Sequence, residues 1–393
     1  MNHDGLAILL RADARNLPLE DGSVDLIVTS PPYFALRNYE DGGEAYGGQV
    51  GAESKPTEFI DALIECTREM IRVLKPSGSI FVNLGDKYAG SGGNNNAGLG
   101  ERATKRGPKS YNKSANVRNK SLLGLPWRYA IRCCDELDLI LRAEIIWSKP
   151  NGLPESVADR ARRAHEQWFH FTKEAKYFAA IDEIREEYVP EGDEGADLGG
   201  RVALGRLPGS VWSIATESLV VPEHLGVDHY AAFPTEWPRR LILGWSPAGI
   251  CTSCGQGRSP VTERRVEKWQ TGHRKTDSDS TKMGGGRSMT ANRGNGPLPN
   301  TVTKTIVGYS CACDQPTAPV RQAVVLDPFG GTGTTAAVAK SLGRIGISVD
   351  LSADYLRLAE WRTNGKGYER VIGKVFADDG DAAAAAAGQQ MLI

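Results

Sequence analysis

Short apolar runs and amphipathic stretches alternate along most of this chain. Apolar residues that recur at helical spacing predict helices, whereas short apolar runs bounded by turn residues predict buried strands. Runs typical of strands cover residues 6–10, 24–28, 79–84, 139–147, 177–181, 324–326 and 344–349. Helical spacing covers residues 59–74, 126–137, 334–342 and 353–361, and the edge of a helix is expected at 165–171. This alternation predicts an α/β fold with a mostly parallel sheet covered by helices on both faces.

Three stretches interrupt the alternation. Residues 88–120 are rich in Gly, Asn and Lys, and residues 251–313 are polar and bracketed by cysteines. Residues 376–393 pass from an acidic segment into a run of alanines. Such compositions bury little apolar surface, so we expect a basic flexible loop, an insertion and a disordered tail, respectively.

Composition narrows the class of protein. The 393 residues allow one large domain with an insertion or two domains, and 40% hydrophobic residues suit a packed core. The formal net charge is −1, so any attraction to a polyanion must come from local patches. No apolar run reaches the ~20 residues that span a bilayer. The N-terminal residues 1–5 do not resemble the start of a secretory signal, and we expect a cytoplasmic protein.

A glycine-rich turn, Asp327-Pro328-Phe329-Gly330-Gly331-Thr332-Gly333-Thr334-Thr335, joins a predicted strand to a predicted helix. Glycines let the backbone approach a nucleotide, and the helix N-terminus offers free N–H groups. The turn lacks the lysine of a phosphate-binding P-loop. Gly331, Gly333 and Ala336 match a loose dinucleotide fingerprint, with Asp350 as the acid for a ribose. S-adenosylmethionine needs the same turn and carboxylate, and a tight turn without a ligand is the remaining alternative.

A second turn, Ser30-Pro31-Pro32-Tyr33, follows the predicted strand at 24–28. It could be a rigid bend only. A chemical role is also available, because the exocyclic amine of a base is a poor nucleophile whose hydrogens need acceptors. Ser30 offers one acceptor, the carbonyl of Pro31 offers a second in a fixed direction, and Tyr33 offers a flat face for a base outside its stack. Methyl transfer to such an amine is an in-line displacement that depends mainly on positioning.

With both turns placed, the chain resembles the β-type DNA amino-methyltransferases, the cytosine-N4 and adenine-N6 family. The resemblance implies a permuted, Rossmann-like class I methyltransferase sheet that begins at its third strand, S-adenosylmethionine as cofactor, double-stranded DNA as partner and a role in restriction–modification. Residues 1–87 and 121–250 would form the catalytic half, including a segment that packs on the cofactor, and residues 318–375 would form the cofactor-binding half.

The resemblance also implies roles for single residues. Asp13 matches an acidic position near the cofactor adenine, and Asp350 matches the ribose-binding acid. Residues 229–234, which include Phe233, resemble the segment that packs on the cofactor methionine, and residues 145–151 with His165-Glu166 resemble the segment beside the target base. Core aromatics are the alternative for Trp147 and Phe233. The catalytic motif is matched by Ser30, Pro31, Pro32 and Tyr33, and the cofactor loop by Asp327, Phe329, Gly330, Gly331, Thr332, Gly333, Thr334 and Thr335.

The first position of the catalytic motif bears on the choice of base. Serine is the usual form in the cytosine-N4 enzymes and aspartate in the adenine-N6 enzymes, although serine also occurs among the latter. Ser30 therefore predicts cytosine-N4, with adenine-N6 as the alternative. Two other classes stay open: a nucleotide-dependent oxidoreductase, which leaves the Ser-Pro-Pro-Tyr turn unexplained, and a zinc-containing DNA-binding protein without catalysis.

Four of the seven cysteines form two close pairs, Cys251 with Cys254 and Cys311 with Cys313. Four thiolates can complete a tetrahedral zinc site, which predicts a zinc-ribbon-like insertion with a structural zinc, and four unligated thiols are the alternative. Related phage-type methyltransferases are similar in carrying a cysteine insert before the cofactor loop.

Two segments and the tail suggest partners. Residues 101–120 hold seven Lys/Arg against one acid, and residues 256–305 hold ten against four. Such patches suit DNA phosphates, so sequence recognition is predicted there, with solvated loops as the alternative. Residues 389–393 resemble the peptide by which bacterial proteins dock on the replication sliding clamp. A monomer or a homodimer is expected.

Overall fold

The computed structural model describes residues 5–35, 40–41, 44–45, 48–90, 117–152, 154–155, 157–186, 205–226, 233–267, 301–313, 315 and 317–377. Several predictions fall outside these described residues. They concern most of the basic loop at 88–120, residues 229–232 of the segment before Phe233, the middle of the basic insertion and the tail with its clamp-like peptide.

An eight-stranded sheet organises the first of two compact units. Its spatial order is β1 (Ala7–Arg11), β14 (Ile345–Asp350), β13 (Val324–Asp327), β2 (Val24–Thr29), β5 (Leu74–Leu84), β7 (His165–Thr172), β6 (Ile140–Ser148) and β8 (Val211–Ser213). The first five strands in this spatial order, β1, β14, β13, β2 and β5, run parallel to one another. The strand β7 runs antiparallel to both of its neighbours, β5 and β6. The N-terminal strand lies at the edge beside two strands from near the C-terminus, which confirms the predicted permutation.

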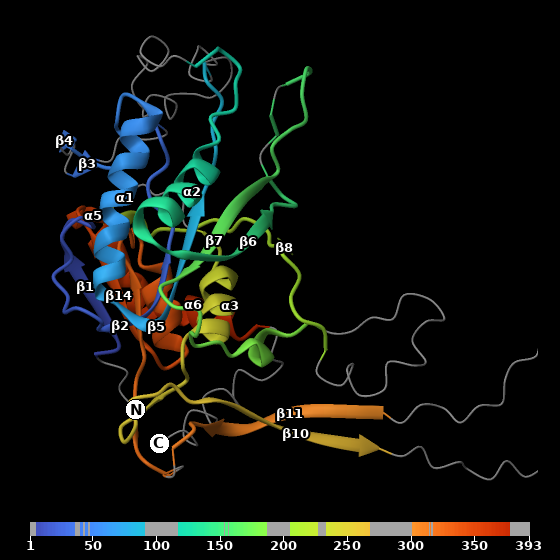
Figure 1. Cartoon of the computed structure of the whole chain (residues 1–393). Helices are drawn as coiled ribbons and strands as arrows, with labels where there is room; N and C mark the ends of the chain where they lie inside the picture. The colour runs from blue at the N-terminus through green and yellow to red at the C-terminus, as the bar shows by residue number, and fades with distance from the viewer. Residues whose placement is uncertain are drawn as a thin grey trace, which may run out of the picture. The chain divides into compact units, whose positions relative to one another are not determined.

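Helices cover both faces of this sheet (Figure 1). One face buries α1 (Pro56–Val73) and α2 (Leu125–Leu137), and the other buries α3 (Glu236–Trp245), α4 (Thr334–Ser341) and α6 (Gly365–Val375). The remaining helix, α5 (Ala353–Thr363), packs against α6 and β1. Within α1, the buried residues Phe59, Leu63 and Met70 recur at helical spacing, so one side of the helix is apolar. The predicted α/β class with two covered faces is confirmed.

Two local predictions were wrong, and two helices were missed. The stretch predicted as a helix edge is the strand β7, whose last five residues are all buried, so the alternation that marks a half-buried strand is absent. Residues 177–181 form no strand and lead into the 3₁₀ helix Ile181–Ile184. The helices α3 and α6 were not predicted, although each carries buried residues four positions apart, Trp237 and Leu241 in α3 and Val371 and Val375 in α6.

Short strand pairs lie outside the main sheet. They are β9 (Ile250–Cys251) with β12 (Val320–Arg321), β10 (Ser259–Glu267) with β11 (Thr301–Ser310), and β3 (Glu40–Asp41) with β4 (Glu44–Ala45). Another 3₁₀ turn covers Glu223–Leu225. The second compact unit consists of Arg185–Pro208 and Pro260–Gly308 and contains most of the β10–β11 hairpin. No helix in the described ranges is long and apolar enough to cross a membrane.

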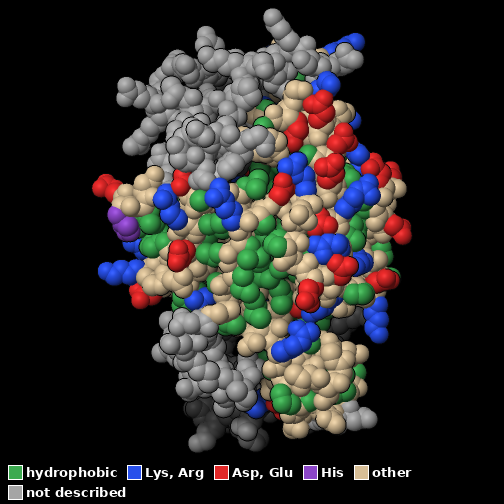
Figure 2. Space-filling view, turned by 90° about the vertical axis from the view of Figure 1, so that its left-hand side faces the viewer, with side chains coloured by type: hydrophobic (Ala, Val, Ile, Leu, Met, Phe, Trp, Pro, Cys, Tyr) green, Lys and Arg blue, Asp and Glu red, His purple; other side chains and the backbone are tan. Residues whose placement is uncertain are grey.

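The surface near β1 carries mixed charge. Figure 2 views the molecule from the left-hand side of Figure 1, where β1 and α5 lie. Among the side chains drawn in colour, Lys and Arg are interspersed with Asp and Glu around a central hydrophobic area. This arrangement agrees with the formal net charge of −1.

Candidate active site

Two loops that are far apart in sequence meet at the carboxyl ends of the neighbouring parallel strands β2 and β13. The strand β2 ends at Thr29 and leads into the Ser-Pro-Pro-Tyr turn, and β13 ends at Asp327 and leads into the glycine-rich loop. The Thr29 hydroxyl donates a hydrogen bond of 2.6 Å to Asp327 Oδ1, and the Thr335 hydroxyl donates one of 2.9 Å to Oδ2. The Phe329 N–H also donates to Oδ1, at 3.1 Å. Asp327 therefore joins the two loops.

The carboxyl group of Asp327 is almost completely removed from water. Asp327 is 1% exposed, and this burial raises its pKa from 3.8 to about 6. The hydrogen bonds from Thr29, Thr335 and Phe329 oppose the rise because they favour the ionised form. The carboxyl group therefore connects the Thr29 side chain with the Thr335 side chain and the Phe329 backbone.

A pocket lies between the two loops. The Ser-Pro-Pro-Tyr turn contributes Ser30 and Pro32 to it, while Pro31 and Tyr33 are not among its lining residues. The other predicted residues that line it are Asp13, Phe233, Phe329, Gly330, Gly331, Thr332, Thr334 and Asp350. Those that lie outside its lining are Asp327, Gly333 and Thr335. The structure thus brings Ser30 and the glycine-rich loop to the same cavity.

Asp350 occupies the end of β14 and faces this cavity. Its Oδ2 accepts a hydrogen bond of 2.9 Å from the Gly331 N–H, and its Oδ1 accepts one of 2.8 Å from the Ser352 N–H. These two donors direct the carboxylate into the wall of the pocket, where carboxylate oxygens can accept hydrogen bonds from the hydroxyl groups of a ribose. The residues present therefore fit a nucleoside at this place.

Glycine is required at two positions of the loop. A Cβ on Gly330 would lie 1.9 Å from Ser348 Oγ, so the loop could not pack this closely on β14. Gly333 precedes α4 with φ of +72°, and a Cβ there would lie 2.8 Å from Ala359 Cβ. Both contacts fix the loop against its supporting elements.

A buried arginine holds the same loop from α5. Arg362 Nη1 donates hydrogen bonds of 2.8 Å to Thr332 Oγ1 and 2.6 Å to Thr334 Oγ1. Arg362 is 5% exposed, and burial lowers its pKa to about 10. Since Thr332 and Thr334 line the pocket, Arg362 positions two of its walls.

Asp13 lies in the pocket wall after β1, paired with Arg15. Arg15 Nη2 lies 2.6 Å from Asp13 Oδ2 and also donates to the carbonyl of Gly48 at 3.1 Å. The hydrogen bonds from the Arg15 side chain lower the pKa of Asp13, so the carboxylate stays ionised. The pair forms a fixed polar edge of the cavity.

Tyr33 belongs to a polar network at the ends of β5 and β7. Its hydroxyl lies 2.7 Å from both Asn83 Oδ1 and Glu166 Oε2, so its single hydrogen can be donated to either acceptor. Asn83 Nδ2 donates to the carbonyl of Gln167 at 3.0 Å, which orients the amide with its oxygen towards Tyr33. The Ser30 hydroxyl points to the same oxygen at 3.4 Å.

Two further contacts immobilise this network. Lys149 forms an ion pair with Glu166, and its Nζ lies 4.0 Å from the centre of the Trp147 ring. A Cβ on Gly85 would lie 2.6 Å from Tyr33 Cε2, so the Tyr33 ring packs directly on the backbone. The ring is therefore held at its hydroxyl end and at its edge.

The sequence left open whether Trp147 and Phe233 are core residues or contact a ligand, and the structure places them differently. Trp147 is 4% exposed, donates to the carbonyl of Ile214 at 2.7 Å and is not among the residues that line the pocket. Phe233 is half-buried, packs edge-on against Trp168 with ring centres 5.8 Å apart, and lines the pocket. Trp147 is thus a core residue here, whereas Phe233 can contact a ligand.

Sequence reasoning missed several residues of the site. Arg15, Gln49 and Tyr355 line the pocket, and Asn83 and Arg362 orient its parts. For two of these residues the sequence pattern contains a feature that could have identified them. Asn83 is a polar residue near the end of an apolar strand, and Arg362 follows buried Leu358 at the spacing of one helical turn.

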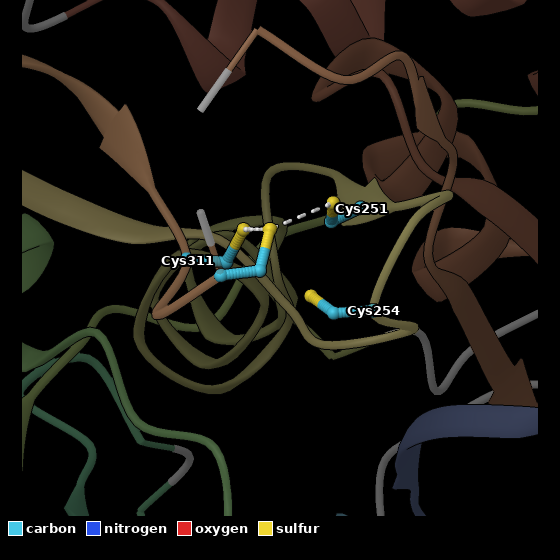
Figure 3. Close-up of side chains that lie close together, drawn as sticks. Cys251, Cys254 and Cys311 are labelled. Carbon is cyan, nitrogen blue, oxygen red and sulfur yellow. Dashed lines mark hydrogen bonds between the residues drawn. The ribbon is translucent and has the colours of Figure 1, made fainter. Parts of the chain in front are cut away.

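The four cysteines of the insertion lie together. Their sulfur atoms are all within 4.8 Å of one another. Figure 3 shows the side chains of Cys251, Cys254 and Cys311 pointing towards one another. Cys313 Sγ lies 3.8 Å from Cys251 Sγ and 3.3 Å from Cys311 Sγ. All four belong to the first compact unit.

Known proteins match this chain in sequence and in fold. The profile of the DNA methylase family matches residues 24–251 and 263–360. The Type II methyltransferase M.Cfr9I of Citrobacter freundii is 35% identical over 246 residues, covering 63% of this chain and 72% of that protein. M.SmaI of Serratia marcescens is 34% identical over 235 residues, covering 59% and 72%. The solved structure of PvuII DNA methyltransferase (cytosine-N4-specific) has a TM-score of 0.53 at 16% identity, covering 94% of this chain and 91% of its own, which establishes similarity of fold.

Proposed function

This chain belongs to the DNA methylase family, and on that premise we propose that it methylates the exocyclic N4 amine of cytosine in double-stranded DNA. The family is S-adenosylmethionine-dependent, and that cofactor supplies an electrophilic methyl group on a sulfonium. The observation that carries the choice of cytosine is Ser30, a neutral hydroxyl that lines the same pocket as Asp350 and Gly331.

The pocket residues suit the parts of the cofactor. The Asp350 carboxylate would accept the ribose hydroxyls, and Phe233 would cover the methionine portion. The N-terminus of α4, which begins at Thr334, offers N–H groups to a carboxylate. Asp13 and Arg15 would form the polar edge near the adenine.

Ser30 and Pro31 would orient the target amine. The Ser30 hydroxyl can donate to Asn83 Oδ1, which leaves its lone pairs available to one amine hydrogen. The carbonyl of Pro31 would accept the other hydrogen. With both hydrogens held, the nitrogen lone pair would be directed at the methyl group that the cofactor supplies, and after transfer the nitrogen would lose one of its two hydrogens as a proton.

Tyr33 would support the base after it leaves the helix. An aromatic face stabilises an unstacked base by about 1–3 kcal/mol. Because Asn83, Glu166 and Gly85 hold Tyr33, little side-chain motion has to be lost when the base arrives. In this proposal Asn83 and Glu166 are positioning residues.

The test is the chemical identity of the methylated nucleoside. Full-length protein is incubated with DNA and radiolabelled S-adenosylmethionine, and the DNA is digested to nucleosides and separated by chromatography. Label in N4-methylcytosine, lost in the Tyr33→Ala variant, is the expected result. Label in N6-methyladenine would overturn the choice of base, and label in neither would overturn the proposed activity.

For sequence recognition we propose the two basic segments, residues 101–120 and 256–305. Their excess of Lys and Arg suits phosphate contacts beside the reacting base. Exchanging either segment with that of a relative should change the methylated sequence, as measured by single-molecule sequencing of host DNA. An unchanged methylated sequence after both exchanges would contradict this assignment.

The final five residues, 389–393, support a proposal about a protein partner: the bacterial replication sliding clamp. Full-length protein should retain the clamp in a pull-down, and protein that lacks these residues should not. Equal recovery by both proteins would refute it.

A further inference from the structure

We propose that Cys251, Cys254, Cys311 and Cys313 bind one structural zinc ion. A tetrahedral site with Zn–S bonds of about 2.3 Å places its sulfur atoms about 3.8 Å apart. The separation of Cys251 and Cys313 is 3.8 Å, that of Cys311 and Cys313 is 3.3 Å, and no pair exceeds 4.8 Å. All of these cysteines are free, and a disulfide would require about 2.05 Å.

Backbone hydrogen bonds fix the turn that carries the first cysteine pair. The Cys251 N–H donates to the carbonyl of Gln256 at 2.9 Å, and the Gly255 N–H donates to the carbonyl of Cys251 at 2.9 Å. In the second pair, Cys313 Sγ lies 3.7 Å from the carbonyl oxygen of Gln315. The turn that holds Cys251 and Cys254 is therefore closed by its own backbone.

Contacts between the two cysteine-bearing segments pre-organise the cluster. The strand β9 pairs with β12, with Cys251 opposite Val320. Thr252 donates to the carbonyl of Pro319 through both its N–H, at 3.0 Å, and its hydroxyl, at 2.9 Å. Arg258 Nη2 donates to the carbonyl of Ala318 at 2.6 Å. The ligands therefore converge because strand pairing holds both segments.

The chemistry of the ligands favours zinc. Four sulfur ligands in tetrahedral arrangement select zinc or iron over magnesium, calcium or manganese. A closed set of four protein ligands leaves no position for substrate, so the ion has a structural role. No cysteine of the cluster lines the pocket that contains Ser30.

The positions of the four cysteines in the chain indicate which two segments a bound ion would join. It joins the segment that follows α3 to the segment that leads into β13 and the glycine-rich loop. In sequence the two cysteine pairs bracket β10 and β11, so an ion bound by all four cysteines would tie the segment before β10 to the segment after β11 through Cys254 and Cys311. Zinc should consequently protect this stretch from opening and from proteolysis.

Metal analysis of the full-length protein tests the proposal. About one zinc per chain is expected in the wild type and in the control Cys134→Ser, which changes a half-exposed cysteine outside the cluster. Cys254→Ser and Cys311→Ser should each retain less than about a tenth of that zinc. Wild-type protein without zinc, iron in its place, or full zinc in both cluster variants would each overturn the proposal.

Two measurements on the wild type remain decisive if a cluster variant fails to fold. Titration with an organomercurial should release the zinc into a colorimetric chelator, followed by faster protease cleavage between residues 255 and 310. Cobalt exchanged for zinc should give the visible absorption of a tetrahedral ion and the near-ultraviolet band of thiolate-to-cobalt charge transfer. Zinc release without faster cleavage would refute the structural role, and an octahedral cobalt spectrum would refute the four-thiolate site.

Discussion

Thr29 and Asp327 share a buried hydrogen bond of 2.6 Å across a separation of 298 residues. Thr29 is the last residue of β2, directly before Ser30, and Asp327 is the last residue of β13, directly before the glycine-rich loop. The bond therefore sets the distance between the residue assigned to the target amine and the loop assigned to the cofactor. The parallel pairing of β2 with β13 makes this contact possible.

Removing the Thr29 hydroxyl should loosen the junction. Thr29→Val removes one of the two hydrogen bonds described for Asp327 Oδ1 and leaves the one from the Phe329 N–H, and a lost buried hydrogen bond costs about 1–3 kcal/mol. We expect lower stability in chemical denaturation and weaker S-adenosylmethionine binding in calorimetry. Thr67→Val is the matched control, because that buried hydroxyl contacts Leu63 and Tyr129 in the helices. Equal cofactor affinity in the two variants would show that the junction does not shape the pocket.

The raised pKa of Asp327 predicts a specific pH dependence of stability. Between pH 3.8 and about 6 the folded state holds a proton on this group that the unfolded state has lost, so stability from this group falls as pH rises through that window. Asp327→Asn removes the effect. The free energy of unfolding of the wild type minus that of the variant should fall by about 3 kcal/mol at most across this window and then stay constant. A difference that does not change with pH would mean that the carboxyl titrates as an exposed group.

The close packing of Tyr33 on Gly85 should limit methyl transfer. In Gly85→Ala the new Cβ would lie 2.6 Å from the ring, so Tyr33 must move away from Asn83 and Glu166. A misplacement of about 1 Å can cost about a hundredfold in rate. We expect a large fall in single-turnover methyl transfer with unchanged cofactor affinity. Gly373→Ala, at an open position in α6, should leave both quantities unchanged.

Arg362 should control the affinity for the cofactor. Arg362→Met removes the donors to Thr332 and Thr334, and S-adenosylmethionine binding should weaken on the order of tenfold. Arg344→Met is the control, because this equally buried arginine donates instead to the carbonyls of Leu342 and Ser246. Both variants should lose stability, and Arg362→Met alone should lose affinity beyond that loss. The same affinity in both variants would contradict the assigned role of Arg362.

Much of the architecture could be predicted from the sequence, because the Ser-Pro-Pro-Tyr turn and the glycine-rich loop each mark the end of a strand. A turn such as the one at Ser30, placed after an apolar run, fixes the direction of β2, and the glycine-rich loop does the same for β13. Their order along the chain, together with the resemblance to the β-type DNA amino-methyltransferases, predicted the permuted sheet. The strand β7 escaped prediction because its residues from Trp168 to Thr172 are buried on both faces and show no alternation.

The partners of the predicted site residues could not be derived in the same way. That Arg362 reaches Thr332 depends on how α5 packs, and that Tyr33 meets Glu166 depends on the antiparallel pairing of β5 with β7. Both are long-range contacts, which residue spacing does not encode. The cysteine cluster was easier to predict, since its four cysteines form two pairs that are close in sequence, and only the two pairs had to meet in the fold.

The measurement that tests the central claim most directly is single-turnover methyl transfer by Ser30→Ala, together with the affinity for S-adenosylmethionine. Because Ser30 is assigned to the amine and not to the cofactor, we predict a fall in the transfer rate on the order of a hundredfold, with a dissociation constant for the cofactor within about twofold of the wild type. The residual product should still be N4-methylcytosine. An unchanged rate, or a rate that falls only in proportion to cofactor affinity, would contradict the role of Ser30 in this active site.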